Sequence, residues 1–222
     1  MVLLLNGPTW FWGYDIIFSV VSILTTLLIM FLSFKAYKMT KDSKYKFFSL
    51  AFLFISLAHL AFSFFNAVII FHLSNRLYNI LQSFDIGFFI YLFLTLLAYI
   101  ILIIIVYKID DNRIIALLLS LTLLFVLFAN QHILKFHIIS LVLLAFLALQ
   151  FYSNFKEKAN KNAKLVFISF YLLLTSEVFF LVNLYTNEYL YVVAQLIQLI
   201  GYLVLFYMFM RVLTYGNEKR EA

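Results

Sequence analysis

Residues 35–71 decide the fold, because KAYKMTKDSKYK (35–46) carries five lysines and FFSLAFLFISLAHLAFSFFNAVIIF (47–71) follows without a single Asp, Glu, Lys or Arg. The second part is longer than the roughly 20 apolar residues that cross a bilayer as a helix. Basic residues stay on the cytoplasmic side during membrane insertion. The stretch therefore predicts a membrane-spanning helix that starts at the cytoplasmic face.

Six further apolar segments predict an all-α integral membrane protein with a bundle of seven transmembrane helices. The predicted spans are residues 15–37, 47–71, 86–107, 114–130, 134–152, 165–184 and 190–212. The fourth span is the shortest and rises only about 26 Å as a helix, so it needs its flanks or a locally thinner bilayer. We expect one transmembrane domain over residues 1–222 and no soluble domain.

The composition excludes a soluble protein. The chain is 66% hydrophobic and 12% charged, with a mean hydropathy of +1.05, whereas soluble proteins are about 45–50% apolar and about 25% charged. It contains no cysteine, which excludes disulfides and thiolate metal sites. The net charge of +6 reflects the basic cytoplasmic segments, so we expect the lipid bilayer of the cell membrane as a partner, and not nucleic acid.

The basic residues alternate along the chain in step with the spans. All but two of the sixteen Lys and Arg residues fall in every second inter-span segment, and Arg76 and Lys135 are the exceptions. This bias predicts that the N-terminus lies outside and the C-terminus in the cytoplasm. The cytoplasmic group is Lys35, Lys38, Lys41, Lys44, Lys46, Lys108, Arg113, Lys156, Lys158, Lys161, Lys164, Arg211, Lys219 and Arg220.

Two outer segments carry local signals. Residues 72–85, HLSNRLYNILQSFD, space their apolar side chains as one face of a helix. They predict an interfacial amphipathic helix or an extension of the third span. Ahead of the first span, Trp10, Phe11, Trp12 and Tyr14 predict an aromatic belt at the outer surface.

A faint repeat predicts a three-one-three arrangement, in which two parallel triplets of helices flank one linker helix. Chance similarity in so apolar a chain is the alternative. Phe47, Ser49 and Ser56 match Phe167, Ser169 and Ser176 at a constant offset, and Ile86-Gly87-Phe88 matches Ile200-Gly201-Tyr202.

Two ionisable residues within the spans are the main functional candidates, because such groups cost about 2.5–3.5 kcal/mol there on insertion scales. Glu177 lies slightly past the midplane of the sixth span, and no basic residue is expected at its depth. It is either a proton-titrating or ligand-contacting carboxyl, or a neutral carboxyl bonded to a neighbouring helix. His59 lies mid-span on a polar face with Ser56, Ser63 and Asn66. That face predicts hydrogen bonds between helices or part of a ligand site.

Polar faces of several spans converge on the outer half of the bundle. On the first span Asp15, Ser19, Ser22, Thr26 and Ser33 share one face. A few convergent polar groups in an apolar wall are typical of small-ligand pockets. A dry, packed polar core is the alternative. The predicted ligand-binding residues are Glu177, His59, Asn66, Asp85, Gln195, Gln198 and Tyr202.

Three histidines lie toward the outer face: His72, His132 and His137. Zinc binds histidine, but the i, i+5 spacing of the last two is poor for one helix face. We expect them to be surface residues at the membrane interface, and we expect no metal and no other cofactor.

Over its whole length the chain resembles microbial rhodopsins in layout. There is no Lys between Gln195 and Arg211, however, so a retinal Schiff base like that of the rhodopsins is not possible there. Two stretches resemble more closely the seven-helix sensor domains at the N-termini of prokaryotic signalling proteins: KYKFFSLAFLFISLAHLAF (44–62) and QLIQLIGYLVLFYMFMRVL (195–213). In those proteins an effector domain follows, and no such domain is expected within the 222 residues. The layout is also similar to sugar-transporting three-one-three proteins, although the helices lack their prolines.

The sequence favours a non-enzymatic, sensor- or receptor-like module. It would bind a small apolar or amphipathic ligand in its outer half and act through a separate membrane or cytoplasmic protein partner. A small-solute or proton-coupled transporter is the second reading, ranked lower because alternating access usually needs Gly- or Pro-interrupted helices. A structural subunit of a membrane complex is the third.

Overall fold

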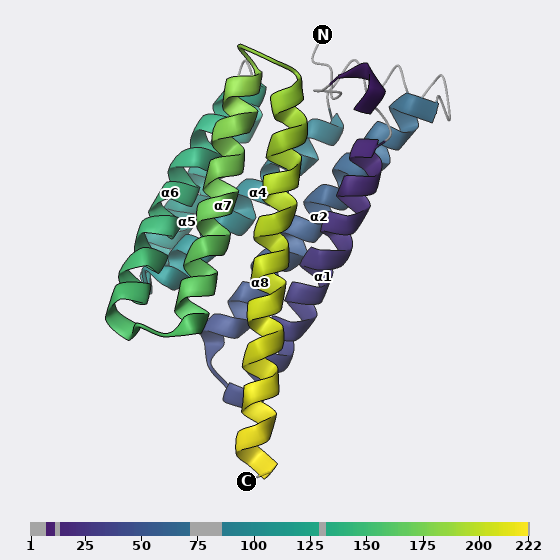
Figure 1. The fold of residues 1–222 in the computed structure, drawn as a ribbon. Helices are drawn as coiled ribbons and strands as arrows, with labels where there is room; N and C mark the ends of the chain where they lie inside the picture. The colour runs from purple at the N-terminus through teal and green to yellow at the C-terminus, as the bar shows by residue number, and fades with distance from the viewer. Residues whose placement is uncertain (1–7, 12–13, 72–85, 129–131, 222) are drawn as a thin grey trace.

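The computed structural model describes residues 8–11, 14–71, 86–128 and 132–221, and every regular element within these ranges is a helix (Figure 1). A 3-10 turn, Thr9–Phe11, precedes seven α-helices. They are α1 (Tyr14–Thr40), α2 (Ser43–Phe71), α4 (Ile86–Val106), α5 (Asn112–Phe128), α6 (His132–Lys158), α7 (Lys161–Asn183) and α8 (Tyr189–Glu221).

Six of these helices are long and apolar enough to cross a membrane, and α5, with 17 residues, is the short one. The predicted multi-pass helical membrane architecture is confirmed at this level. The helix expected as the fourth span is short, as predicted, and its crossing of the membrane stays a prediction. The outside position of the N-terminus stays a prediction. The proposed amphipathic helix over 72–85 lies outside the described residues.

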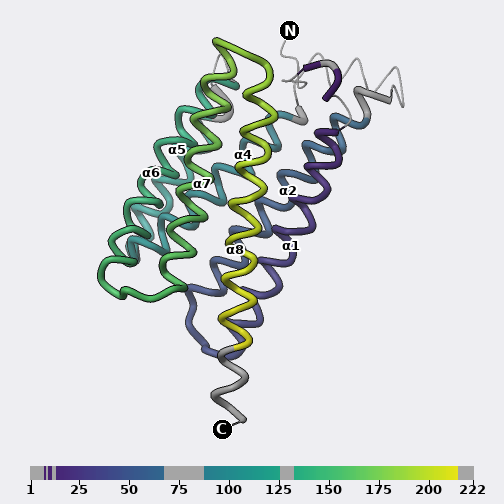
Figure 2. Tube along the Cα trace, in the orientation of Figure 1, coloured from purple at the N-terminus to yellow at the C-terminus, as the bar shows by residue number. Residues whose placement is uncertain are grey.

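Six helices form a closed ring, and α5 lies outside it. The main contacts join α1 to α2, α2 to α4, α4 to α6, α6 to α7, α7 to α8 and α8 back to α1, whereas α5 packs mainly on α4. Successive helices run in opposite directions, so the two termini lie at opposite ends of the bundle (Figures 1 and 2). We call these the N-terminal end and the C-terminal end. The ring contains two helix triplets separated in sequence by α5, but the internal duplication itself stays a prediction.

Left-handed residues follow three helices at the C-terminal end of the bundle. Lys41, Lys108 and Ala159 have φ values of 59°, 54° and 47°. The N–H of Ala159 donates to the carbonyl of Phe155 at 2.9 Å, a geometry that ends a helix. Asn160 then caps α7 by accepting the N–H of Ala163 at 2.7 Å. This two-residue turn holds α6 and α7 antiparallel.

Gly201 lets α7 and α8 approach closely in the middle of the bundle. A Cβ at this position would lie 3.1 Å from Cδ2 of Leu173 and 3.3 Å from the carbonyl oxygen of Ser169. The Ser169 hydroxyl donates to the carbonyl of Gly201 at 2.8 Å. This contact belongs to the main core, where Phe52, Tyr99 and other aromatic side chains are fully buried.

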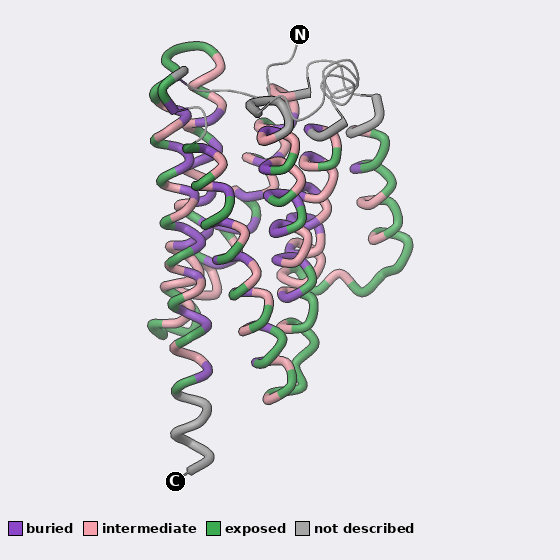
Figure 3. The backbone as a smooth tube through the Cα atoms, turned by 90° about the vertical axis from the view of Figure 1, so that its right-hand side faces the viewer, coloured by how far each residue is buried: buried purple, intermediate pink, exposed green. Residues whose placement is uncertain are grey.

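The polar faces predicted for the first two spans point into the bundle. Asp15, Ser19, Ser22, Thr26 and Ser33 of α1 are all buried, and so are the polar residues on the equivalent face of α2: Ser49, Ser56, His59, Ser63 and Asn66. Large apolar side chains are exposed along the helices, and Figure 3 shows buried and exposed positions alternating along the ring helices. This distribution suits contact with lipid, because hydrocarbon has no water to satisfy polar groups.

The predicted aromatic belt is wrong for one residue. Trp10 and Tyr14 are exposed, but Phe11 is only 3% exposed. Its ring packs on Phe18 and on the edge of Tyr191, with centroids 5.5 and 6.1 Å away. The 3-10 turn folds Phe11 back onto the ring of helices, an effect that composition alone does not reveal. Trp12 lies outside the described residues.

Candidate functional site

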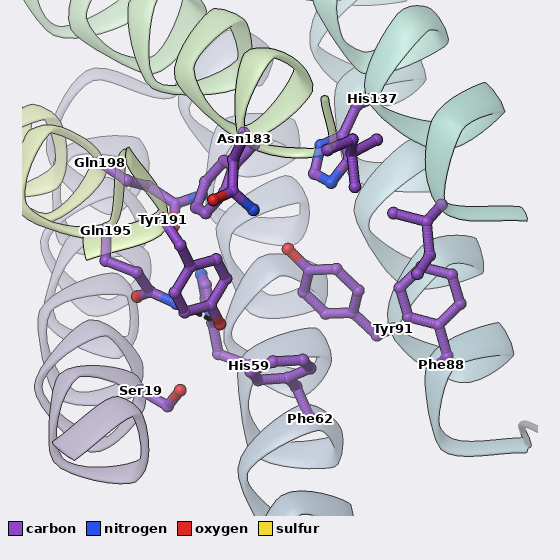
Figure 4. Close-up of a pocket in the computed structure, with 13 residues that line it drawn as sticks. Ser19, His59, Phe62, Phe88, Tyr91, His137, Asn183, Tyr191, Gln195 and Gln198 are labelled. Carbon is purple, nitrogen blue, oxygen red and sulfur yellow. Dashed lines mark hydrogen bonds between the residues drawn. The ribbon is translucent and has the colours of Figure 1, made fainter. Parts of the chain in front are cut away.

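A cavity lies inside the ring, in the N-terminal half of the bundle (Figure 4). The volume open to the centres of water molecules is about 40 Å³, which is room for roughly three waters. All six ring helices contribute to its wall. The lining residues are Ser19, His59, Phe62, Phe88, Tyr91, Ile133, His137, Phe180, Asn183, Leu184, Tyr191, Gln195 and Gln198.

His137 on α6 contacts Glu177 on α7. Its Nδ1 lies 2.7 Å from Oε2 of Glu177, and the side chains are 12% and 2% exposed. The imidazole also stacks on Phe180, with ring centroids 5.4 Å apart. Two predictions are therefore wrong: His137 is not a surface histidine, and Glu177 does have a basic group at its depth.

The sequence did contain a signal for this pair. His137 lies five residues after the start of α6, and Glu177 lies six residues before the end of α7. Both ends belong to the N-terminal end of the bundle, so the two residues lie at equal depth on adjacent antiparallel helices. The predicted span began at residue 134, two residues late, and therefore placed His137 too close to the interface.

His59 joins α2 to α8 across the ring. Its Nε2 lies 3.3 Å from the hydroxyl of Tyr202, and the two rings meet edge to face with centroids 5.7 Å apart. Tyr202 is 1% exposed and His59 is 6% exposed. His59 thus holds two helices together and at the same time forms part of the cavity wall.

Of the remaining predicted site residues, some line the cavity and others do not. Gln195 and Gln198 line the cavity, and Nε2 of Gln195 donates to the hydroxyl of Tyr191 at 3.0 Å. Asn66 does not line it, because its amide donates to the carboxylate of Asp15 at 3.3 Å. Asp85 lies outside the described residues.

Two predicted residues lie directly behind the cavity wall. Glu177 contacts the lining residue His137, and Tyr202 contacts the lining residue His59. The structure therefore brings five of the seven predicted residues to one site, while their role in ligand binding stays a prediction.

Asn183 is a lining residue with one buried, unpartnered oxygen atom among the described residues. Its Oδ1 is buried and accepts no hydrogen bond from the described part of the chain. A buried carbonyl in this state costs about 1–3 kcal/mol. Within the described ranges, no three His, Asp or Glu side chains are grouped to hold a metal ion.

No protein-family model, curated protein or solved structure matches the chain. The interpretation of the cavity rests on its own chemistry.

Proposed function

We propose that this protein is a non-enzymatic, sensor- or receptor-like membrane module. It binds a small ligand in the cavity and acts through a separate protein partner at the C-terminal end of the bundle. The wall of the cavity takes side chains from every helix of the ring, so a bound ligand can couple helices that are far apart in the sequence.

The course of α8 is the observation that carries this proposal. Its first turns supply Tyr191, Gln195 and Gln198 to the cavity wall, and Tyr202 follows below them. The same helix then runs without interruption to Glu221 and projects beyond its neighbours at the C-terminal end (Figure 1). Its 33 residues rise about 50 Å, more than the roughly 30 Å hydrocarbon thickness. A tilt or rotation of α8 that a ligand causes at the cavity is therefore transmitted along the helix to the C-terminal end of the bundle.

Proton-coupled transport is the second candidate, and the His137–Glu177 pair favours it, because proton relays in membranes use such residues. The helices argue against it. Transporter sites are typically formed by discontinuous helices, whereas the six long helices described are continuous.

Distance measurements between spin labels test the proposal. Lys158→Cys at the end of α6 and Thr214→Cys on α8 place labels at the C-terminal end of a chain that has no native cysteine. The purified protein is treated separately with methylammonium chloride, methanol, acetamide and sodium acetate. We expect at least one compound to shift the distance distribution, and Gln198→Leu in the cavity wall to abolish that shift.

Two outcomes overturn the sensor assignment. Uptake of the effective compound into proteoliposomes, with no change in the distance, supports transport. A distance distribution that is unchanged with all four compounds, together with no uptake, supports a structural subunit with a filled polar core.

A further inference from the structure

We propose that a second hollow, an apolar cleft on the outside of the ring, binds one acyl chain of a zwitterionic phospholipid. The cleft lies between α5 and the ring helices α4 and α6 (Figure 1), and none of the residues that line it also line the cavity inside the ring. The proposal follows from the dry wall of the cleft, its depth in the membrane and the charges on the turn that joins α4 to α5.

The wall of the cleft is apolar. Seven of its eight lining residues are Leu, Ile or Phe, and the eighth is Thr122. The hydroxyl of Thr122 donates to the carbonyl of Leu118 at 2.8 Å, so its proton is not available to a ligand. The volume open to the centres of water molecules is about 160 Å³. A cavity of about 150 Å³ with a wall of Leu, Ile and Phe stays dry and binds benzene, so this cleft suits hydrocarbon and not water.

The cleft lies at the depth of lipid acyl chains. Leu96 in its wall is the central residue of α4, and Ile100 lies about one turn farther along the same helix. Leu121 on α5 is 52% exposed, so the cleft opens to the surroundings of the protein. An unfilled apolar wall loses its dispersion contacts. In a membrane the hydrocarbon that fills such a wall is a lipid acyl chain.

The turn between α4 and α5 carries both signs of charge. Lys108, Asp110, Asp111 and Arg113 are all exposed on it, at the C-terminal end of two helices that line the cleft. Arg and Lys bind phosphate, and a carboxylate attracts an ammonium group. A phosphoethanolamine headgroup supplies both partners. A headgroup with negative charge alone would instead be repelled by the two aspartates, so the turn favours a zwitterionic lipid.

The spacing between the turn and the cleft fits one lipid molecule. Leu118, the first residue of α5 in the cleft wall, lies six residues after the start of the helix at Asn112, a rise of about 9 Å. From Leu118 to Phe125 the wall rises by a further ~10 Å. One leaflet contributes about half of the roughly 30 Å hydrocarbon thickness. A lipid with its headgroup at the turn therefore has the methyl end of an acyl chain in the cleft.

Native mass spectrometry of the purified full chain in detergent tests the proposal, with phosphatidylethanolamine as the probe. A titration that follows the lipid-bound fraction of the protein gives the Kd. Phosphatidylglycerol with the same acyl chains is the comparison, because it differs only in its anionic headgroup. We expect one phosphatidylethanolamine to be retained per chain, and phosphatidylglycerol to bind roughly tenfold more weakly, a difference of about 1.4 kcal/mol.

Ile139→Trp fills the cleft from α6 with a larger side chain, and Ile138→Trp is the matched control. Ile139 lines the cleft, whereas the neighbouring Ile138 is 44% exposed and does not line it. We expect Ile139→Trp to raise the Kd for phosphatidylethanolamine by roughly tenfold or more, about 1.4 kcal/mol, and Ile138→Trp to leave it unchanged. Thr122→Phe fills the cleft from α5 and provides a second variant if Ile139→Trp does not fold.

The proposal is overturned if phosphatidylglycerol binds as tightly as phosphatidylethanolamine, if neither lipid is retained, or if both filled-cleft variants bind phosphatidylethanolamine like the wild type. A dimer that carries no lipid and that Ile139→Trp dissociates also overturns it, because the cleft then receives a second copy of the chain.

Discussion

At the scale of single residues, hydropathy gives the depth of a polar group but not its neighbours. The sequence identified Glu177 and His59 as buried groups, because ionisable residues are expensive within spans. It missed the contact of His137 with Glu177, since that contact depends on which helices are adjacent. It also missed that Asn66 pairs with Asp15 rather than facing the cavity. Side-chain partners follow from packing, which the pattern of apolar residues does not contain.

The pair of His137 and Glu177 gives a prediction with a graded outcome. Glu177→Gln keeps a hydrogen-bonding group of similar shape beside Nδ1 of His137 but cannot carry the charge that strengthens such a bond, so we expect a loss of about 1 kcal/mol. Glu177→Leu leaves Nδ1 of His137 buried without its partner, and we expect a loss of about 1–3 kcal/mol. The measurement is thermal unfolding of each variant in detergent.

A double-mutant cycle supplies the control for this prediction. If the two side chains are coupled, Glu177→Leu combined with His137→Phe will destabilise the protein by less than the two single changes added together. Additive losses would show that the 2.7 Å contact contributes nothing to stability.

At the scale of elements, the sequence predicted the helices well and their ends less well. The predicted span 134–152 is a helix from His132 to Lys158, and the span 190–212 extends to Glu221. A span predicted from hydropathy ends at the first charged residues, but the helix itself continues through Lys and Glu, which are good helix formers. The actual ends are set by local backbone geometry, as at Ala159 and Asn160.

The left-handed residue Ala159 makes the turn between α6 and α7 a testable element. Its φ of 47° is unfavourable for a side chain with a Cβ, by about 1–2 kcal/mol. Glycine removes this penalty but gains flexibility in the unfolded chain, so we expect Ala159→Gly to stabilise the protein by a net ~0.5 kcal/mol. Ala145→Gly within α6 is the control and should destabilise by about 0.8–1 kcal/mol. Thermal unfolding that ranks both variants below the wild type would contradict this account of the turn.

At the scale of the whole molecule, the number of helices could be predicted, but their lateral arrangement could not. Each long apolar segment predicts one helix. No feature of the sequence, however, shows that α5 lies outside a closed ring formed by the other six helices. The cavity depends on that ring, because its wall takes side chains from α1, α2, α4, α6, α7 and α8. Convergence of the polar faces was predictable from their spacing, and the composition of the wall was not.

The orientation of the bundle in the membrane is predicted by charge alone, and labelling with an impermeant thiol reagent tests it. Basic residues cluster around the turns at the C-terminal end, so that end should lie in the cytoplasm. Ser43→Cys, Asn112→Cys and Asn162→Cys, each at or near the start of a helix at that end, should react only from the cytoplasmic side.

Asn187→Cys, between α7 and α8 at the opposite end, should react only from outside. The chain has no native cysteine, so there is no background reaction. Leu196→Cys, at an exposed position on the outside of α8, serves as the lipid-facing control and should stay unreactive from either side. Labelling of Asn187→Cys from the cytoplasmic side would show that the bundle has the opposite orientation in the membrane. The cavity would then lie in the cytoplasmic half of the bundle, and α8 would carry its displacement outward instead of to a cytoplasmic partner.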